Sequence, residues 1–326
     1  MKRKRQLALD KRDMKLLYLL DVNGRESLSN LGKGLRMSKQ FVKYRIGRLE
    51  KEGFIKGYFP MIDTTRLGLI SFRVYLKFQG LNPDKKQEII ESLKRDKLVW
   101  AVILVAGKWD LALGIGVKNI FQFYEVWDKF LEKYIQYIKS YNVTIYSPIY
   151  HYPSSYLTEE KKTPKTRILG GKEKYDYDQK DIKILIELSK NARAPLIDIS
   201  ERVGLSPDAV NRRIKNLEKE GVIQGYRAMI DITKLGYQFY KADIRLTKYS
   251  EINELYLFCQ NHPNIYQIDK TIGGETFEVE FHVKSLKDMF DIIGEMQKVF
   301  PNTIGSFDYF AFLGQEKITY MPDIKI

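Results

Sequence analysis

Residues 38–53 read SKQFVKYRIGRLEKEG, and residues 206–221 read SPDAVNRRIKNLEKEG, so one helical segment occurs twice in the chain. Outward from this segment, residues 9–68 align with residues 177–236 without a gap, and 26 of these 60 positions are identical. A repeat of this length is a whole subunit and not a small solenoid unit. The sequence therefore predicts a duplicated, fused chain whose copies form an intrachain pseudo-dimer, similar to a two-fold dimer.

The composition indicates a globular protein of several domains. The chain has 326 residues, and its apolar share of 44% is ordinary for folded proteins. The basic start MKRKRQ has no signal-peptide apolar core behind it, and the sequence has no apolar run of about 20 residues that could span a membrane. The single Cys259 excludes an internal disulfide and a cysteine metal cluster. These features predict a cytoplasmic protein with no membrane partner.

The positive charge is concentrated in the first copy. The net charge is +14; residues 1–150 hold 29 Lys and Arg against 15 Asp and Glu, whereas residues 176–326 hold 20 against 23. A concentrated positive field favours a polyanionic partner such as nucleic acid. The alternative is that a lysine-rich surface only confers solubility.

Each copy begins with the pattern of a helix-turn-helix. In the first copy, caps and apolar spacing predict helices at residues 10–20, 27–34 and 38–53. The third helix buries Val42, Ile46 and Leu49, which recur at i, i+4 and i+7. Residues 54–59 and 61–63 then predict a short strand pair within the head, a wing. The second copy repeats each of these features from Asp178 onward.

The rest of each copy follows a strand–helix–strand–strand–helix–strand order, which is the ferredoxin-like βαββαβ motif. We expect strands at residues 72–78, 99–105, 111–117, 143–150, 240–246, 266–272, 278–283 and 303–312, with helices at 83–95, 121–138, 252–259 and 286–300. The predicted fold class is therefore α+β, with two copies of a winged helix-turn-helix joined to a ferredoxin-like domain. The predicted domains are winged helix-turn-helix at residues 1–68, ferredoxin-like at 69–152, exposed linker at 153–174, second winged helix-turn-helix at 175–236 and second ferredoxin-like domain at 237–326.

The third helix of a helix-turn-helix enters the major groove of DNA. Its outward residues in the first copy are Lys39, Gln40, Lys43, Tyr44 and Arg48. The two lysines can donate to guanine or phosphate, the glutamine can pair with adenine, and the tyrosine suits a phosphate or sugar. We therefore predict double-stranded DNA as the partner. The alternative is an ordinary solvated helix face.

The second recognition helix is a weaker candidate. Its outward residues are Pro207, Asp208, Asn211, Arg212 and Lys215. The aspartate repels phosphate, although it can accept a hydrogen bond from cytosine. This head either reads a different half-site or has become a structural partner. Arg45 and Arg213, at matched positions beside the buried stripes, contact phosphate or form a salt bridge to Asp13 or Asp181.

The residues that recur in both heads form a long motif. It comprises Asp10-x-x-Asp13, Arg25, Leu28-x-x-Leu31, Met37-Ser38, Val42-x-x-Arg45-Ile46-x-x-Leu49-Glu50, Gly53-x-Ile55-x-Gly57-Tyr58, Ile62-Asp63 and Leu67-Gly68, and it returns at residues 178–236. With the bodies that follow, it resembles the Lrp/AsnC (leucine-responsive, or feast/famine) transcription regulators over nearly the whole chain. The resemblance implies a winged-helix DNA reader joined to a ligand-sensing, dimerising domain that often assembles into larger homo-oligomers. The chain departs from the family by carrying two copies, so we expect the basic dimer within one chain.

The resemblance also implies an effector region at the turn between the second and third body strands. In the first copy this turn is Gly107-Lys108-Trp109-Asp110, and the candidate effector residues are Gly107, Trp109 and Asp110. The aspartate would favour the ammonium group of an amino-acid effector, and the glycine allows close backbone approach. In the second copy Thr276 stands where the aspartate stood. The alternative at both turns is a tight hairpin without a ligand.

Catalysis is poorly supported by the sequence. The three histidines, His151, His262 and His282, form no HExxH arrangement, and no phosphate-binding loop of the GxxxxGK type is present. We therefore expect no enzyme, no metal and no cofactor, but a sequence-specific transcription regulator. One alternative is an architectural protein that coats DNA with little sequence preference. The other is an enzyme resembling the sirohaem decarboxylases, which look like paired units of the same family.

Overall fold

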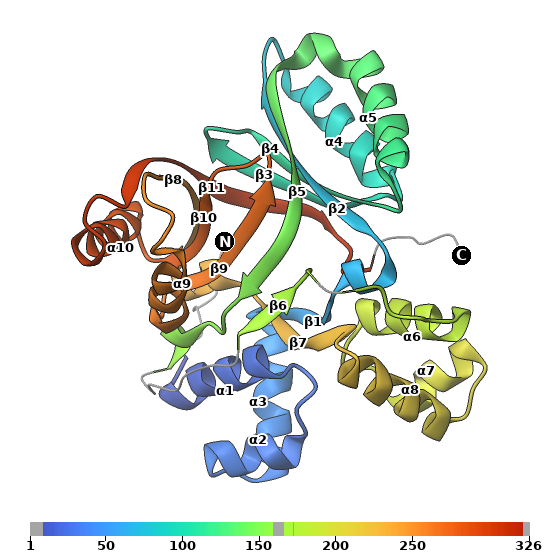
Figure 1. Ribbon diagram of the computed structural model, residues 1–326. Coiled ribbons are helices and arrows are strands. Elements are labelled where there is room, and N and C mark those ends of the chain that lie inside the picture. The colour runs from blue at the N-terminus through green and yellow to red at the C-terminus, as the bar shows by residue number, and fades with distance from the viewer. Residues whose placement is uncertain (1–8, 159–165, 172, 322–326) are drawn as a thin grey trace, which may run out of the picture.

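The computed structural model describes residues 9–158, 166–171 and 173–321. Both copies adopt the same order of elements, which Figure 1 shows. The first head consists of α1 (Lys11–Val22), α2 (Leu28–Leu35), α3 (Lys39–Lys51), β1 (Ile55–Ile62) and the 3-10 turn η1 (Thr64–Leu67). The second head consists of α6 (Gln179–Lys190), α7 (Leu196–Val203), α8 (Pro207–Lys219), β7 (Ile223–Ile230) and the 3-10 turn η4 (Ile232–Leu235).

Capping hydrogen bonds confirm the predicted helix starts. The side chain of Asp10 accepts from the backbone N–H of Asp13 at 2.8 Å, and Asp13 accepts from Asp10 in return, which makes a capping box. The second copy repeats this box at the start of α6. Ser38 and Ser206 cap α3 and α8 in the same way. These bonds satisfy N–H groups that a helix start leaves unpaired, so both recognition helices begin at matched positions.

The prediction that each wing is a strand pair within its own head is wrong. Residues 55–62 form the single strand β1, which pairs antiparallel with β7 of the other copy, from Ile55 opposite Ile230 to Ile62 opposite Ile223. The stretch carries no two-residue turn sequence that would fold it back on itself. Its backbone groups are satisfied by the matching strand of the second copy instead. The two heads are therefore joined by a shared two-stranded ribbon.

The bodies follow the predicted element order. The first contains β2 (Ile70–Phe78), α4 (Pro83–Arg95), β3 (Val99–Gly107), β4 (Leu111–Val117), α5 (Ile120–Tyr134), the 3-10 turn η2 (Ile135–Tyr137) and β5 (Ile138–His151). The second contains β8 (Gln238–Leu246), α9 (Ile252–Asn261), β9 (Ile265–Ile272), β10 (Phe277–Val283), α10 (Leu286–Val299) and β11 (Ile304–Ile318). The strand orders β5-β2-β4-β3 and β11-β8-β10-β9 are those of a ferredoxin-like fold.

The two body sheets close on each other into an eight-stranded barrel. β5 pairs with β9, and β3 pairs with β11, both antiparallel. β5 is longer than predicted mainly at its start, where residues 138–142 pair with β2 of the same body, whereas its second half pairs with β9 of the other body. In Figure 1 the helices α4 and α5 lie outside the barrel on one flank, and α9 and α10 lie outside it on another. The intrachain pairing of the two copies is thus confirmed, and each sheet has one face toward its helices and one toward the barrel interior.

The segment predicted as an exposed linker is partly packed against the fold. Pro153, Ser154 and Leu157 are buried, and a 3-10 turn η3 (Ser155–Leu157) follows the end of β5. A short strand β6 (Arg167–Leu169) pairs with that end of β5. Residues 159–165 and 172 of the predicted linker lie outside the described residues. The low apolar content of this segment concealed its few buried positions. Across the described ranges, no helix combines the length and the apolar character that crossing a bilayer requires.

Candidate nucleic-acid interface

The N-terminal half of α3 presents a basic outward surface. Lys39, Gln40, Lys43 and Tyr44 are all exposed, which agrees with the orientation predicted for them. The helix carries no acidic residue before Glu50. The side chain of Ser38 caps its start, and the positive end of the helix dipole at this N-terminus adds to the lysine charges. This surface can donate hydrogen bonds to phosphates and base edges; DNA contact by these residues stays a prediction.

Phe41 is an exposed residue of α3 that was not among those predicted to contact DNA. Its ring is 44% exposed and stacks on Tyr44 with ring centroids 6.0 Å apart. Phe41 lies three residues before Tyr44 and off the Val42 stripe, and this spacing was the available signal. Nearby, a Cβ added at Gly47 would meet nothing within 4 Å. The outward face of α3 therefore combines lysines with an aromatic pair and an open stretch of helix backbone.

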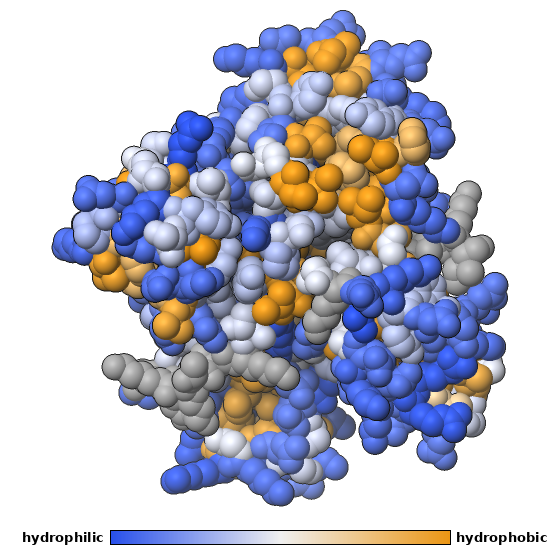
Figure 2. All heavy atoms as spheres, in the orientation of Figure 1, coloured by the Kyte–Doolittle hydropathy of each residue, from blue (hydrophilic) through white to orange (hydrophobic). Residues whose placement is uncertain are grey.

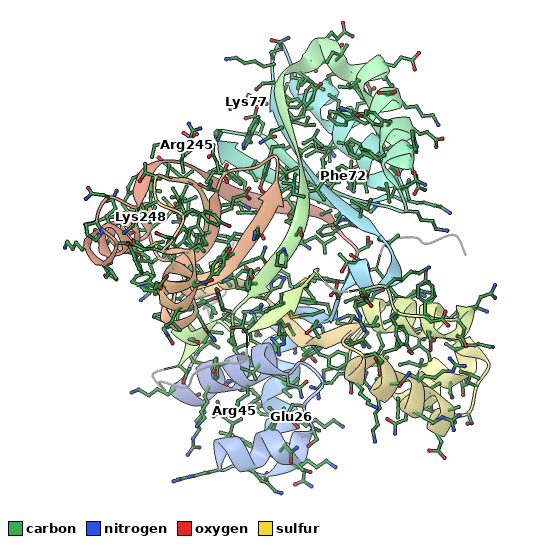
Figure 3. All side chains as sticks on the ribbon, in the orientation of Figure 1. Glu26, Arg45, Phe72, Lys77, Arg245 and Lys248 are labelled. Carbon is green, nitrogen blue, oxygen red and sulfur yellow. The ribbon has the colours of Figure 1, made fainter. Side chains whose placement is uncertain are left out.

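Arg45 and Arg48 do not point outward, which corrects the prediction for Arg48. Nη1 of Arg45 lies 2.8 Å from Asp10 Oδ1 and 2.6 Å from Asp13 Oδ1, and Figure 3 shows Arg45 between α1 and α3. Nη2 of Arg48 lies 2.6 Å from the other oxygen of Asp13. The hydrogen bond from Arg45 lowers the pKa of Asp10 to about 2. Of the two alternatives for Arg45, the structure bears out the salt bridge, because a carboxylate 1% exposed requires cationic partners.

The second recognition helix keeps a basic outward surface. Arg212 and Lys215 are exposed, and Asn211 is half-buried. Arg213 is tied back to α6, with contacts of 2.9 Å to Asp178 and 2.8 Å to Asp181, as Arg45 is tied to α1. An open depression on α8 is lined by Arg212, Arg213, Lys215, Asn216 and Lys219. The second head thus repeats the internal bracing of the first and also exposes cations.

Reciprocal contacts lock the heads onto the shared ribbon. The N–H of Gly24 donates to the carbonyl of Tyr226 at 2.9 Å, and the N–H of Ala192 donates to the carbonyl of Tyr58 at 2.9 Å. Arg193 donates to the carbonyl of Gly24 at 2.7 Å. One continuous hydrophobic core contains apolar side chains from both heads. These pairs are related by the offset of the repeat, so the heads are held in a pseudo-two-fold arrangement.

One buried ion pair has no counterpart in this symmetry. Asp21 at the end of α1 lies 2.6 Å from Nη2 of Arg227 on β7, and both side chains are almost fully buried. The other oxygen of Asp21 accepts from the backbone N–H of Ser154 at 2.7 Å. The repeat places Ser189 and Phe59 at the matched positions. The first head is therefore tied to both the ribbon and the start of the inter-copy segment.

The structure gives the predicted effector residues structural partners. Oδ1 of Asp110 lies 2.9 Å from Lys77 Nζ, and its Oδ2 accepts from the N–H of Phe78 at 2.9 Å. Trp109 is buried and stacks on Tyr75 with centroids 5.7 Å apart. Gly107 has φ +123°, and a Cβ there would lie 3.0 Å from the carbonyl oxygen of Tyr309 on β11. The backbone of β11, a strand of the barrel, thus occupies the space that the absence of a side chain at Gly107 leaves.

In the second copy a threonine makes the hydrogen bonds that hold the turn to the neighbouring strand. Oγ1 of Thr276 accepts from the N–H of Leu246 at 2.7 Å and donates to the carbonyl of Ile244 at 3.1 Å. Thr276 thus fixes the end of β8 as Asp110 fixes the end of β2. This correspondence favours the tight-hairpin alternative at both turns, and effector binding there stays a prediction.

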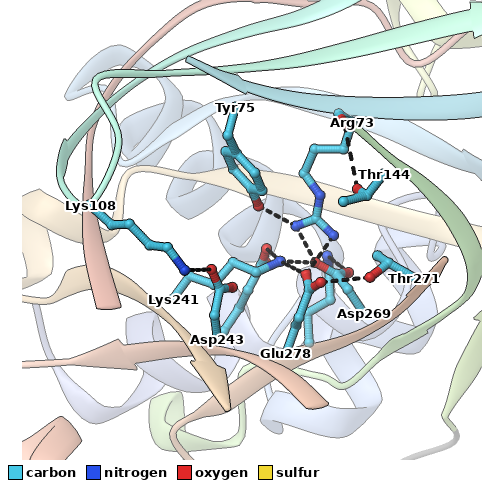
Figure 4. Close-up of polar contacts among 11 residues, drawn as sticks. Arg73, Tyr75, Lys108, Thr144, Lys241, Asp243, Asp269, Thr271 and Glu278 are labelled. Carbon is cyan, nitrogen blue, oxygen red and sulfur yellow. Dashed lines mark hydrogen bonds and ion pairs between the residues drawn. The ribbon is translucent and has the colours of Figure 1, made fainter. Parts of the chain in front are cut away.

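A buried charge network lies inside the barrel between the two bodies (Figure 4). Nη1 of Arg73 is 2.8 Å from Asp269 Oδ2, and Nη2 of Arg73 is 2.9 Å from Glu278 Oε2. Lys241 contacts the same two carboxylates, and its Nζ is 2.8 Å from Glu278. Burial alone would raise the pKa of Asp269, but Arg73 and Lys241 outweigh burial and hold this pKa below its ordinary value. The cations and carboxylates compensate one another across the interface of the two copies.

His282 is a core residue, whereas His151 and His262 are partly buried. Burial lowers the pKa of both His151 and His282 to about 3, so both rings are neutral at physiological pH. Nδ1 of His282 lies 3.0 Å from the hydroxyl oxygen of Tyr156, and its ring stacks on Tyr266 at 4.2 Å. His282 lies on β10, a strand whose residues are all buried. In the part of the chain that the structure describes, no three His, Cys, Asp or Glu side chains are grouped to hold a metal ion.

Comparison with known proteins identifies relatives of each copy. A family model described as winged helix-turn-helix DNA-binding matches residues 9–56 and 177–224. The chain is 35% identical over 98 residues to the HTH-type transcriptional regulator LrpA of Pyrococcus horikoshii, a match that covers 26% of this chain and 70% of that protein. It is 28% identical over 151 residues to the HTH-type transcriptional regulator FL11 of the same organism, covering 44% of this chain and 95% of that protein. Each relative therefore corresponds to about one copy.

A solved structure matches the chain over both copies. The siroheme decarboxylase NirDL superposes with a TM-score of 0.62 over 96% of this chain and 94% of that chain, at 12% sequence identity. At this identity the likeness shows the fold alone. The two proteins share the arrangement of two heads and two bodies in one unit.

Proposed function

Because this chain belongs to the Lrp/AsnC family of DNA-binding transcription regulators, in a tandemly duplicated form, we propose that it binds double-stranded DNA sequence-specifically through the outward faces of α3 and α8. The observation that carries the proposal is that the arginines of α3 form salt bridges within the head, whereas its lysines face solvent. Arg45 and Arg48 are bound to Asp13, whereas Lys39 and Lys43 are exposed. The exposed lysines are thus available to phosphates and guanine edges.

The distribution of charge supports the same proposal. The net charge of +14 is carried by the first copy. On the visible face in Figure 2, the second head is largely hydrophilic and the first head is hydrophilic around an apolar patch. Binding to DNA through lysines releases counterions, so affinity should fall steeply as salt rises. Bidentate contacts by Gln40 with adenine would add sequence preference to this electrostatic attraction.

The direct test is fluorescence anisotropy of the full chain on random-sequence duplex DNA across a salt series. Replacing Lys39 and Lys43 with Ala should weaken binding and reduce the slope of log affinity against log salt by about 1.8, because each lost phosphate contact removes about 0.9. The matched control is the double replacement of Lys129 and Lys298, two exposed lysines on α5 and α10, with Ala. The control changes the net charge equally but leaves α3 intact.

An unchanged slope in the Lys39/Lys43 variant would reject these residues as phosphate contacts. Absence of DNA binding at low salt would reject the regulator proposal as a whole. Binding with equal affinity to every sequence would favour the architectural alternative. We propose no enzymatic role, and the same full chain can be titrated with a sirohaem analogue, whose visible absorbance should not change.

We further propose that a small molecule such as an amino acid modulates this binding at the turn containing Gly107, Trp109 and Asp110. A ligand ammonium group there would compete with Lys77 for the carboxylate of Asp110. The test is the melting temperature of the full chain with each amino acid in turn, repeated with Asp110→Asn. A ligand-induced rise that Asp110→Asn abolishes supports the proposal, and no rise with any amino acid rejects it.

A further inference from the structure

The spacing of the two recognition helices is built into the fold. β1 and β7 pair over their whole lengths, and the reciprocal bonds of Gly24 and Ala192 attach each head to the strand of the other copy. α1 packs on β7 and α6 packs on β1, so each head rests on the other copy's strand. The distance and the orientation between α3 and α8 are therefore fixed when the chain meets DNA.

The outward faces of α3 and α8 carry different residues. At the four matched positions, Lys39, Gln40, Lys43 and Tyr44 of α3 are replaced by Pro207, Asp208, Asn211 and Arg212 of α8. The first set offers two cationic donors and an amide suited to adenine, whereas the second offers a carboxylate that accepts from cytosine. The stacked pair of Phe41 and Tyr44 also has no aromatic counterpart on α8.

The second head nevertheless has the properties of a DNA reader. Arg212, Lys215 and Lys219 place cations along an open depression on α8, and Arg213, which also lines it, is bound to Asp178 and Asp181. Ser206 caps the helix start in the same geometry as Ser38. These cations can contact the phosphates of DNA.

We propose that the DNA site of this chain is asymmetric, with two unlike half-sites at one fixed spacing, and this inference rests on the proposed DNA-binding function. A homodimer places identical helices about its two-fold axis and reads an inverted repeat. In this chain the β1–β7 ribbon holds the two heads in a pseudo-two-fold arrangement, but the outward residues of α3 and α8 differ. The half-site under α3 is specified by Gln40 and the two lysines, and the half-site under α8 is specified by Asp208, Asn211 and Arg212.

The test begins with selection of binding sites by the full chain from a pool of random duplexes. The expected motif has two different halves separated by a constant number of base pairs. An inverted repeat, or enrichment of one half alone, would overturn the inference while leaving DNA binding intact. No binding to any duplex would overturn the proposed function and the inference together.

A graft then assigns the second half to α8. Pro207→Lys, Asp208→Gln, Asn211→Lys and Arg212→Tyr, combined in the full chain, give α8 the four reading residues of α3. The graft should prefer an inverted repeat of the first half-site by about tenfold or more over the originally selected site, since each good base contact discriminates by roughly this factor. Lys298→Ala on α10 is the control and should keep the original preference.

The single variant Asp208→Gln covers the case in which the graft fails to fold. It should lose preference at one base pair of the second half-site only, and the first half-site should remain as selected. If Asp208→Gln and the graft both retain the original preference at every base pair, α8 does not read the second half and the inference is overturned.

Discussion

Glu280 is a buried carboxyl group whose protonation should govern how stability depends on pH. It lies inside the barrel on β10, with its carboxyl oxygen 3.7 Å from Lys241 Nζ. Burial, together with the negative charge of Asp269, raises the pKa of Glu280 from 4.5 to about 8. Between these pH values the folded chain keeps a proton that the unfolded chain has released. The free energy of unfolding therefore falls as pH rises through this window, as far as Glu280 determines it.

Replacing Glu280 with Gln should remove this contribution. Relative to the unaltered chain, Glu280→Gln should gain stability as pH rises from about 5 to about 8, at up to about 1.4 kcal/mol per pH unit. Urea unfolding at several pH values measures the difference in the free energy of unfolding between the variant and the unaltered chain. The contributions of other titrating groups largely cancel in this difference. Glu254→Gln, on the exposed face of α9, is the control. A pH profile for Glu280→Gln parallel to that of the unaltered chain would contradict the prediction.

The direction of long side chains is what the sequence could predict least at this scale. The exposure of Lys39 and Lys43 followed from helical periodicity, because the buried Val42 fixes which face is outward. Arg48 has a stem long enough to reach either DNA or α1, and spacing alone does not choose between them. The deciding fact is the burial of Asp13, which only the packing of α1 on α3 reveals. Asp110 is a similar case, since its partner Lys77 lies on another strand.

At the scale of elements, helices were predictable and the ribbon was not. Caps and periodic apolar residues are local signals, so the predicted starts of α3 and α8 agree with the structure. The pairing of β1 with β7 joins residues about 170 positions apart in sequence. The sequence of a strand indicates that it must pair with another strand, but it does not indicate whether that strand is near or distant in the chain. The same reason explains why β5 extends further than its own body requires.

Gly24 tests how closely the first head is attached to the ribbon. A Cβ at this position would lie 2.8 Å from the backbone carbonyl carbon and oxygen of Arg227 on β7. Because these neighbours are backbone atoms, they cannot move aside without disturbing the ribbon. Gly24→Ala should therefore lower the free energy of unfolding by about 1–3 kcal/mol, as overpacking does. Urea denaturation of the full chain measures the change.

The matched control is the same substitution where space is open. Gly47 lies within α3, and a Cβ there would meet nothing within 4 Å. Gly47→Ala should stabilise the chain by about 0.5–1 kcal/mol, because alanine has the higher helix propensity. Equal effects of the two substitutions would show that the contact between Gly24 and β7 contributes nothing to holding the head.

At the scale of the whole molecule, the two bodies present unlike inner faces to each other. By strand register, the inner positions Arg73, Ile103, Ala112 and Gly114 of the first body correspond to Lys241, Asp269, Glu278 and Glu280 of the second. At these four positions the first body supplies a cation among apolar and small residues, and the second supplies a cation with three carboxyl groups; a fourth carboxyl group, Asp243, lies opposite Glu278. The charges are compensated when the unlike bodies face each other.

Pairing of like bodies between chains would leave charges uncompensated. Two first bodies would bury two Arg73 guanidinium groups without a carboxylate at these positions, and two second bodies would bury all their carboxyl groups around two copies of Lys241. Removing an unpaired ion from water costs several kcal/mol. The interior network therefore favours pairing within one chain, and this pairing in turn keeps two different recognition helices together.

Arg73 is the residue that the first body contributes to this compensation. Arg73→Met should lower the free energy of unfolding by about 3–5 kcal/mol, because Asp269 and Glu278 would then share Lys241 alone. Adding Glu278→Gln should recover part of the loss, since it removes one uncompensated carboxylate. Arg245→Met, at an exposed position of β8, is the control and should change stability by less than about 0.5 kcal/mol. If Arg73→Met costs no more than this control in urea unfolding, charge compensation across the barrel does not hold the two copies together.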